Sequence, residues 1–153
     1  MVARHYARRD NLLIRPATLS DRAAIIEILK PEMAKYPLRP DKDKIWEGLT
    51  EAISAKRHFA WVAVVKKKVT GVILALTNDN LWAQRMNSNV VAWVANTPGT
   101  GTSLMRQFIK WVKSRRAIRV AGMAIDCEVD DRVWALAQRL GYERCNGTLH
   151  LFN

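Results

Sequence analysis

The pattern of apolar and polar positions predicts an ordered series of strands and helices in the first part of the chain. Leu12–Arg15 is an apolar segment of strand length. Ser20 is placed to cap a helix with an apolar face, and Pro31 is expected to end that helix. From Asp41 to about Ser54, apolar residues recur at helical spacing, which predicts a second helix.

Strand signals dominate the middle of the chain. The runs Phe59–Val65 and Val69–Thr77 are rich in β-branched residues and flank the charged segment Lys66–Lys68, so together they predict an antiparallel hairpin. Asn78–Asn89 is polar with a few apolar positions, which predicts a long connection. Val90–Ala95 is expected to be the next strand.

Helices and strands alternate in the last third. A helix with an apolar face is expected after Ser103, followed by a strand at Ile118–Ile125, a helix at Asp130–Leu140 and at least one strand between Tyr142 and Phe152. The predicted order is therefore strand, two helices, three strands, helix, strand, helix, strand. We expect an α/β fold with a mixed sheet and helices on its faces, because strand–helix–strand crossovers bury apolar strands on both sides.

Length and composition fit one folded domain. The chain has 153 residues, of which 49% are hydrophobic, enough for a core without disulfides or a metal. We expect a single domain at 11–153 after a basic arm at 1–10. No apolar run approaches the roughly 20 residues of a membrane helix, so we expect a soluble cytoplasmic protein without membrane contact, either a monomer or a homodimer. Cys127 and Cys145 are far apart and no His clusters with them, so no metal site is predicted.

Positive charge is the main compositional signal. The chain has 25 Lys and Arg against 14 Asp and Glu, a net charge of +11, which predicts a polyanionic partner: nucleic acid, an acidic protein or a phosphorylated cofactor. Between Gly99 and Ala124 there is no acidic residue. Without a partner, the basic residues would form a solvated helix face, and Trp82 would cover the core. The candidate contacts for a polyanion or a substrate are Trp82, Arg85, Arg115 and Arg116.

Glycines mark the passage from the strand Val90–Ala95 to the following helix. In Pro98-Gly99-Thr100-Gly101-Thr102-Ser103 they let backbone N–H groups approach an anion, and a helix N-terminus adds about half a positive charge. Such a turn can hold a pyrophosphate. It is neither a Walker A loop nor the full dinucleotide fingerprint, whose third glycine falls at Leu104. Glycine turns that bind no ligand also precede helices.

Three segments, in order along the chain, resemble the GNAT superfamily of acyl-CoA-dependent N-acyltransferases. Ile14–Asp21 is similar to the family's first strand and helix start, Pro98–Ser103 to its pyrophosphate loop, and Asp130–Tyr142 to its penultimate helix with a closing Leu-Gly-aromatic. The resemblance runs from about residue 12 to the end and, with Asn80–Arg85, is greatest to small bacteriophage-encoded members. It implies a mostly antiparallel central sheet that splays between the fourth and fifth strands, with helices on both faces.

The resemblance also implies an activity: transfer of an acyl group, in the first place acetyl, from acyl-CoA to an amine acceptor by direct attack on the thioester. The cofactor would be acetyl-CoA or another acyl-CoA. Cys127, as proton donor to the thiolate or as nucleophile, and Asp130, as base, are the candidate catalytic residues. The candidate cofactor contacts are the backbone of Trp93 and Val94 at the splay, and Gly99, Thr100, Gly101, Thr102 and Ser103 in the pyrophosphate turn.

The chain departs from the family pattern at several functional positions. Pro98 stands where the loop motif usually has Gln or Arg, and Ala137 aligns with the Tyr that protonates the leaving thiolate in many members. Asp130 aligns with an Asn that touches the pantetheine arm, and Glu128 and His150 are alternative bases. Two other functions therefore stay open: a GNAT-like binding module that contacts nucleic acid or an acidic protein without catalysis, and an acyltransferase acting on an amine borne by a nucleic acid.

Overall fold

A seven-stranded mixed sheet organises the protein, for which the computed structural model describes residues 12–35, 37, 39–124, 131–145 and 148–152. The strand order is β1-β2-β3-β4-β5-β7-β6, and β4–β5 is the parallel pair in an otherwise antiparallel sheet. The strands are β1 (Leu12–Pro16), β2 (Phe59–Val65), β3 (Lys68–Asp79), β4 (Met86–Ala95), β5 (Ile118–Ala124), β6 (Glu143–Cys145) and β7 (Thr148–Phe152).

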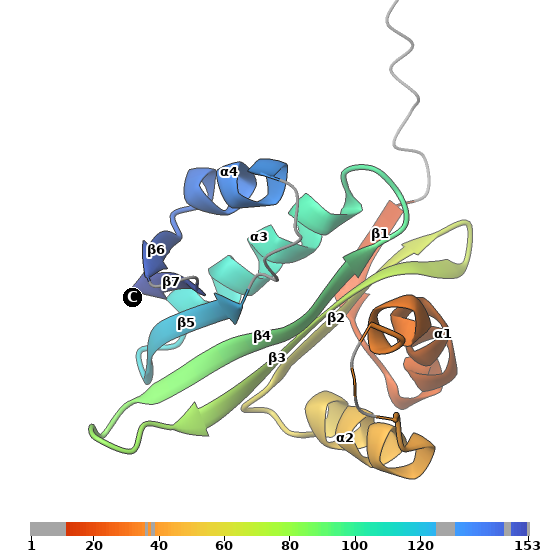
Figure 1. Ribbon diagram of the computed structural model, residues 1–153, viewed down its shortest axis with the longest axis horizontal. Coiled ribbons are helices and arrows are strands. Elements are labelled where there is room, and N and C mark those ends of the chain that lie inside the picture. The colour runs from red at the N-terminus through yellow and green to blue at the C-terminus, as the bar shows by residue number, and fades with distance from the viewer. Residues whose placement is uncertain (1–11, 36, 38, 125–130, 146–147, 153) are drawn as a thin grey trace, which may run out of the picture.

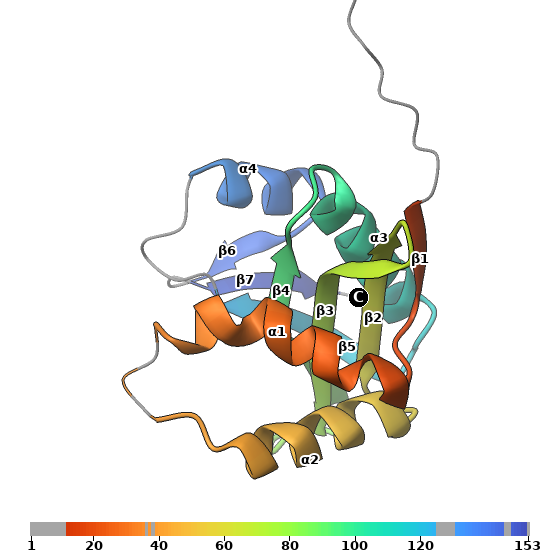
Figure 2. The ribbon, with the colours of Figure 1, turned by 90° about the vertical axis from the view of Figure 1, so that its right-hand side faces the viewer.

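Helices cover both faces of this sheet, as Figures 1 and 2 show. One face packs against the first two helices and the other against the third, with the fourth beside β6. The predicted α/β class with a mixed sheet between helices is therefore confirmed. The helices are α1 (Arg22–Met33), α2 (Lys42–Ser54), α3 (Thr100–Lys113) and α4 (Asp131–Arg139), and a 3₁₀ turn (Leu19–Asp21) precedes α1.

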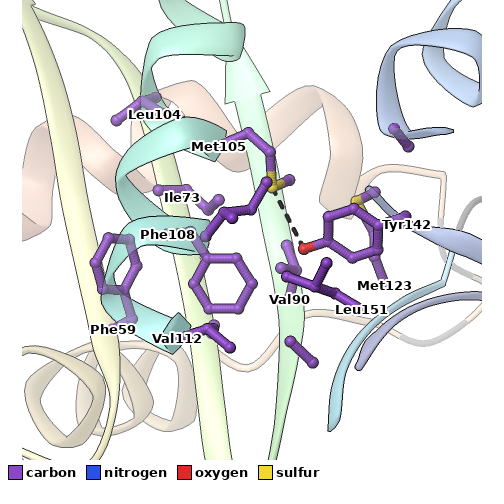
Figure 3. Close-up of a cluster of buried hydrophobic side chains, with 14 of the residues drawn as sticks. Phe59, Ile73, Val90, Leu104, Met105, Phe108, Val112, Met123, Tyr142 and Leu151 are labelled. Carbon is purple, nitrogen blue, oxygen red and sulfur yellow. Dashed lines mark hydrogen bonds between the residues drawn. The ribbon is translucent and has the colours of Figure 1, made fainter. Parts of the chain in front are cut away.

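Two apolar clusters fill the two sides of the sheet. Because side chains alternate along a strand, Val72 of β3 faces α1 and α2, whereas its neighbour Ile73 faces α3. On the α3 side, the rings of Phe108 and Phe59 pack with centroids 5.3 Å apart. Figure 3 shows this cluster on the α3 side, with Tyr142 reaching α3 from the segment that follows α4. The sheet is thus covered by an apolar cluster on each side.

The predicted long connection Asn78–Asn89 is wrong. β3 continues to Asp79 and β4 begins at Met86, so the connection is residues 80–85. The two strands form an antiparallel hairpin through this polar segment, with Thr77 opposite Ser88. Both side chains are buried, and their hydroxyl oxygens lie 3.0 Å apart in a hydrogen bond. Polar residues therefore satisfy each other inside the sheet, which their polarity alone did not indicate.

The boundaries of α1 also differ from the prediction. Ser20 lies inside the 3₁₀ turn, and the helix start is fixed by Asp21, whose carboxylate accepts hydrogen bonds from the N–H and hydroxyl of Thr18. Pro31 lies within α1, which ends at Met33. A proline lacks a backbone N–H and therefore removes one helical hydrogen bond. In the last turn this single loss does not end the helix, which continues for two residues beyond Pro31.

The described ranges contain neither a membrane-spanning helix nor a cluster of metal-binding side chains. No helix there is long and apolar enough to span a bilayer. Within the same ranges, no group of three or more His, Cys, Asp or Glu side chains is arranged to hold a metal ion.

Candidate functional site

The parallel strands β4 and β5 separate part-way along the sheet. They pair from Met86 opposite Ile118 to Val90 opposite Met123, and β4 then continues to Ala95 with no paired residue on the part of β5 that the structure describes, which ends at Ala124. On its other edge, β4 contains a bulge at this point, because Val91 is the one extra residue between two consecutive pairs with β3. A bulge bends its strand and increases the local twist. The sheet therefore opens along one edge of β4 beyond Val90.

Backbone donors line this opening. The N–H of Asn96 donates to the carbonyl of Thr70 at 2.8 Å, on the β3 side. Because N–H groups along a strand point alternately to its two edges, those of Trp93 and Ala95 point away from β3, into the opening. By the same alternation, the N–H of Val94 points toward β3. Of the two predicted backbone contacts, Trp93 is thus the one whose N–H faces the opening.

A tight turn joins the open end of β4 to α3. Gly99 precedes the helix with a φ of +82°, in the left-handed region where a Cβ would add strain. The helix begins at Thr100, so the segment Thr100–Ser103, predicted as part of the loop, is its first turn. The Thr100 hydroxyl donates to the carbonyl of Thr97 at 2.6 Å and the Ser103 hydroxyl to that of Gly99 at 3.1 Å. Both side chains therefore brace the turn.

The first turn of α3 presents two N–H groups. Among the described residues, no acceptor is paired with the N–H of Gly101 or Thr102, whereas those of Thr100 and Ser103 donate to carbonyls of the turn. The first N–H groups of a helix have no partner within it, and the dipole of a 14-residue helix places roughly half a positive charge beside them. This end of α3 is suited to an anion.

Trp93 joins the strand to this helix end. Its indole Nε1 donates to the carbonyl of Gly101 at 3.0 Å. A Cβ built on Gly101 would lie 3.4 Å from the Cβ of Ala95, which is the closeness of an ordinary packing contact. The turn therefore rests directly on the last residues of β4, and the helix N-terminus is held next to the opening.

A polar position lies on the other face of the sheet, just before the strands part. Asn89 of β4 is paired with Gly122 of β5. The Oδ1 atom of Asn89 lies over Gly122, so close that a Cβ there would collide with it. Sequence reasoning missed Asn89, because it was assigned to a connection. The signal that could have indicated it is Gly122, since a glycine inside a strand often marks a close approach.

Comparison with known proteins relates this architecture to solved structures. No protein-family model matches the sequence, and no curated protein matches it. The chain superposes on a GNAT-family acetyltransferase from Streptococcus pneumoniae (14% identity, 91% of this chain and 95% of that one, TM-score 0.71). It also superposes on a ribosomal-protein-alanine N-acetyltransferase from Brucella melitensis (18%, 92% and 99%, 0.76) and on Arabidopsis thaliana NAA60 in complex with acetyl-CoA (11%, 93% and 99%, 0.73). The chain has the GNAT fold. The expected splay between the fourth and fifth strands is part of this confirmed fold.

The GNAT fold places the predicted residues in two separate regions. Trp93, its neighbour Val94 and the turn Gly99–Ser103 lie together at the open end of β4. The other four lie at the opposite end of the sheet, because residues 80–85 and 114–117 meet where the N–H of Met86 donates to the carbonyl of Ala117 at 2.9 Å. Those four are Trp82, Arg85, Arg115 and Arg116. Cys127, Glu128 and Asp130 lie outside the described residues, as does the side chain of His150.

The described part of α4 and its exit is apolar where it meets the GNAT core. Ala137, the position that the resemblance aligns with a proton-donating Tyr, is completely buried. Tyr142 is buried as well, its hydroxyl lies 3.5 Å from the sulfur of Met105, and burial raises its pKa well above the usual value. This phenol is therefore a neutral core group.

A hollow on the other face of the GNAT sheet was not predicted. It lies between α1 and α2 and has a volume of about 900 Å³. Its wall includes Ile26, Met33, Ile45 and Trp46, and charged residues of both signs stand among the residues that line it. The hollow is thus an apolar groove, separated from α3 by the sheet.

Proposed function

We propose that the protein is an N-acyltransferase that transfers an acyl group, in the first place acetyl, from acyl-CoA to an amine. The observation that carries this is the opening of the sheet beyond Val90, with the N-terminus of α3 held at its end by Trp93. The GNAT fold supports the proposal, and NAA60, which has this fold, was determined with acetyl-CoA.

The backbone fits the two polar parts of an acyl-CoA. The N–H groups of Gly101 and Thr102 would hold the pyrophosphate, since the start of a helix favours anions. The N–H groups of Trp93 and Ala95 would donate hydrogen bonds to the carbonyl oxygens of the pantetheine arm or polarise the thioester carbonyl. Acyl-CoA would supply the activated acyl group, and the chain would orient it along β4.

The amine would approach from the face of the sheet that carries Asn89, because the other face is filled by the apolar contacts of α3. The carboxamide of Asn89 is a suitable acceptor for an amine N–H. The proton steps are assigned from the sequence. Cys127 would protonate the thiolate and Asp130 would take the proton of the attacking ammonium, and both belong to the connection between β5 and α4.

Calorimetric titration of the purified protein with acetyl-CoA and with CoA tests the cofactor. We expect saturable binding of both with one site per chain. Turnover is tested by incubating acetyl-CoA with a panel of amines (amino acids, peptide N-termini, polyamines and aminoglycosides) and measuring acylated product by mass spectrometry. Absence of binding to either compound would overturn the proposal.

Thr102→Asp is a sharper test of the pyrophosphate site. A carboxylate in the first turn of a helix favours the folded protein, but here it would stand where the cofactor's phosphates bind. We expect affinity for CoA to fall about tenfold or more through like-charge repulsion, with an unchanged or slightly raised melting temperature. In Thr102→Asn the new side chain has the shape of Asp without its charge, so this variant should bind CoA nearly as the original protein does. Equal loss in both variants would contradict the assignment.

A second candidate function is a GNAT-fold binding module that has no transfer activity. Ala137 favours it, because a methyl group cannot protonate a thiolate. CoA binding without an acylated product from any amine, and without CoA release, would support this second function over the first.

A further inference from the structure

The turn between β3 and β4 displays two large apolar side chains to solvent. Leu81 is 85% exposed and Trp82 is 90% exposed. The turn is nevertheless ordered by two hydrogen bonds of Asn80. Its side-chain oxygen accepts from the backbone N–H of Trp82 at 2.8 Å, and its backbone N–H donates to the carbonyl of Arg85 at 2.8 Å. An indole that is held out in this way presents its ring faces to a partner.

This turn lies beside the segment that follows α3. The first residue pair between β4 and β5 joins Met86 to Ile118, and a hollow of about 250 Å³ between the two segments is lined by Asp79, Arg85 and Ala117 among others. Figure 1 shows both segments at the end of the sheet where the β3–β4 hairpin projects. We call this region, made of Leu81, Trp82, Arg85, Arg115 and Arg116, the basic end.

Cations dominate the basic end and the helix that leads to it. Asp79 at the end of β3 is the acid nearest to it in the sequence, and from Asn80 to Ile125 there is no Asp or Glu. The basic side chains of this stretch are exposed, and three of them repeat at helical spacing along α3. They are Arg85, Arg106, Lys110, Lys113, Arg115, Arg116 and Arg119.

The basic end is remote from the proposed pyrophosphate site. Gly99 precedes the first residue of α3, and Arg115 follows its last residue by two. The helix has 14 residues, a length of about 20 Å at 1.5 Å per residue. Figure 1 shows the two ends of α3 at opposite ends of β4. The charge around Arg115 and Arg116 therefore lies too far away to serve the pyrophosphate.

We propose that the basic end binds single-stranded nucleic acid. Trp82 would stack on a base, and the arginines would contact the flanking phosphates. Stacking on an exposed aromatic ring needs an open base face, which a single strand offers along its length. The guanidinium group matches the geometry of a phosphate, and arginines outnumber lysines in this region. This inference is independent of the acyltransferase proposal.

Fluorescence anisotropy with a labelled oligothymidine of about 20 nucleotides tests the proposal, since sites on such surfaces span roughly 4–16 nucleotides. We expect saturable binding that weakens as salt rises, with a slope of about −2 in log K against log salt if three phosphates are contacted. Trp82→Ala should weaken binding roughly tenfold, and Trp82→Phe, which keeps a ring for stacking, should restore most of it.

Arg116→Gln separates charge from stacking. It should lower affinity and reduce the salt slope by about 0.7, because one phosphate contact is lost. Both Trp82 and Arg116 are exposed, so thermal melting should be unchanged. Trp46→Ala and Lys44→Gln on α2 are matched controls, since they change a partly exposed Trp and an exposed cation elsewhere. Neither should alter oligonucleotide binding.

Four outcomes would overturn the proposal. The first is no binding at low salt. The second is equal affinity for oligothymidine and polyglutamate, which would show nonspecific charge attraction. The third is a loss in Trp46→Ala as large as in Trp82→Ala, which would show that stacking is not specific to the basic end. The fourth is binding to phosphatidylserine vesicles without binding to the oligonucleotide, which would make the partner a membrane surface. Thr102→Asp should keep oligonucleotide affinity, so failure of the acyltransferase proposal is recognised separately.

Discussion

Asp21 shows how one side chain fixes the start of the fold. Its carboxylate accepts four hydrogen bonds, two from the guanidinium of Arg15 at 2.7 and 2.9 Å and two from Thr18 at 2.8 and 2.9 Å. The side chain is 8% exposed. The hydrogen bonds from Arg15, aided by those from Thr18, lower the pKa of Asp21 from 3.8 to about 2. This cluster ties β1 to the beginning of α1.

This pKa predicts a specific loss of stability in acid. Because the folded state holds the proton less tightly than the unfolded state, the contribution of Asp21 is complete above about pH 4 and is lost as the pH falls toward 2. Urea unfolding at pH 5 and at pH 2.5 should differ by about 1–2 kcal/mol more in the original protein than in Asp21→Asn, allowing for solvent screening at Arg15. An identical pH dependence in both proteins would contradict the assignment.

Residues differ in how far the sequence could indicate them. The glycine turn at Gly99 was found, because a glycine before a helix is a local signal. Asn89 was missed, because its importance comes from its neighbour Gly122 on another strand. Cys127 and Asp130 stay predictions, since they lie outside the described residues.

The joint between β4 and α3 is the element on which the proposed site depends. Trp93 holds it through one hydrogen bond, from the indole to the carbonyl of Gly101 at 3.0 Å. Trp93→Phe keeps an aromatic ring in the core and removes this bond. We expect a loss of about 1 kcal/mol in the free energy of unfolding.

Affinity for CoA should also fall several-fold in Trp93→Phe, because the first turn of α3 would be less firmly placed. Calorimetry and thermal melting measure the two effects. A matched control is Trp111→Phe on the same helix, whose indole lies away from the turn. Loss of stability without any loss of CoA affinity would show that the joint does not organise the site.

Element boundaries were predicted well where apolar periodicity is strong and poorly where polar residues are buried. The runs Phe59–Val65 and Ile118–Ile125 agree closely with β2 and β5. The β3–β4 hairpin was missed, because the polar segment Asn78–Asn89 was assigned to a connection although Ser88 is buried in the sheet and pairs with Thr77 at the end of the predicted strand. Because the hairpin extends to residues 80–85, the four predicted contacts Trp82, Arg85, Arg115 and Arg116 lie at the same end of the sheet. The basic end could therefore be recognised only in the structure.

At the scale of the whole molecule, the sheet separates two sides of unequal packing. Phe108 on the α3 side is fully buried and packs against Phe59. Met33 on the other side is partly exposed and lines the hollow between α1 and α2. The α3 side therefore carries more of the stability, while the α1–α2 side keeps space that the fold does not fill.

Paired substitutions test this asymmetry. Phe108→Ala should lower the free energy of unfolding by about 3–5 kcal/mol, as expected for a cavity in a well-packed core. Met33→Ala removes a side chain that already borders open space, so we expect a loss of about 1 kcal/mol or less. Urea unfolding followed by circular dichroism measures both. Comparable losses would contradict the asymmetry.

The overall topology was predictable because each crossover joins segments with clear periodicity, while the opening in the sheet was known only through family resemblance. That opening depends on a count: β4 has one residue more than β3 at Val91. We expect the opening to tolerate substitutions on the two strands better than the removal of one residue there, which would abolish the bulge and its bend. A site of this kind is more vulnerable to a shift in spacing than to substitution, and it can persist where sequence identity has fallen below recognition.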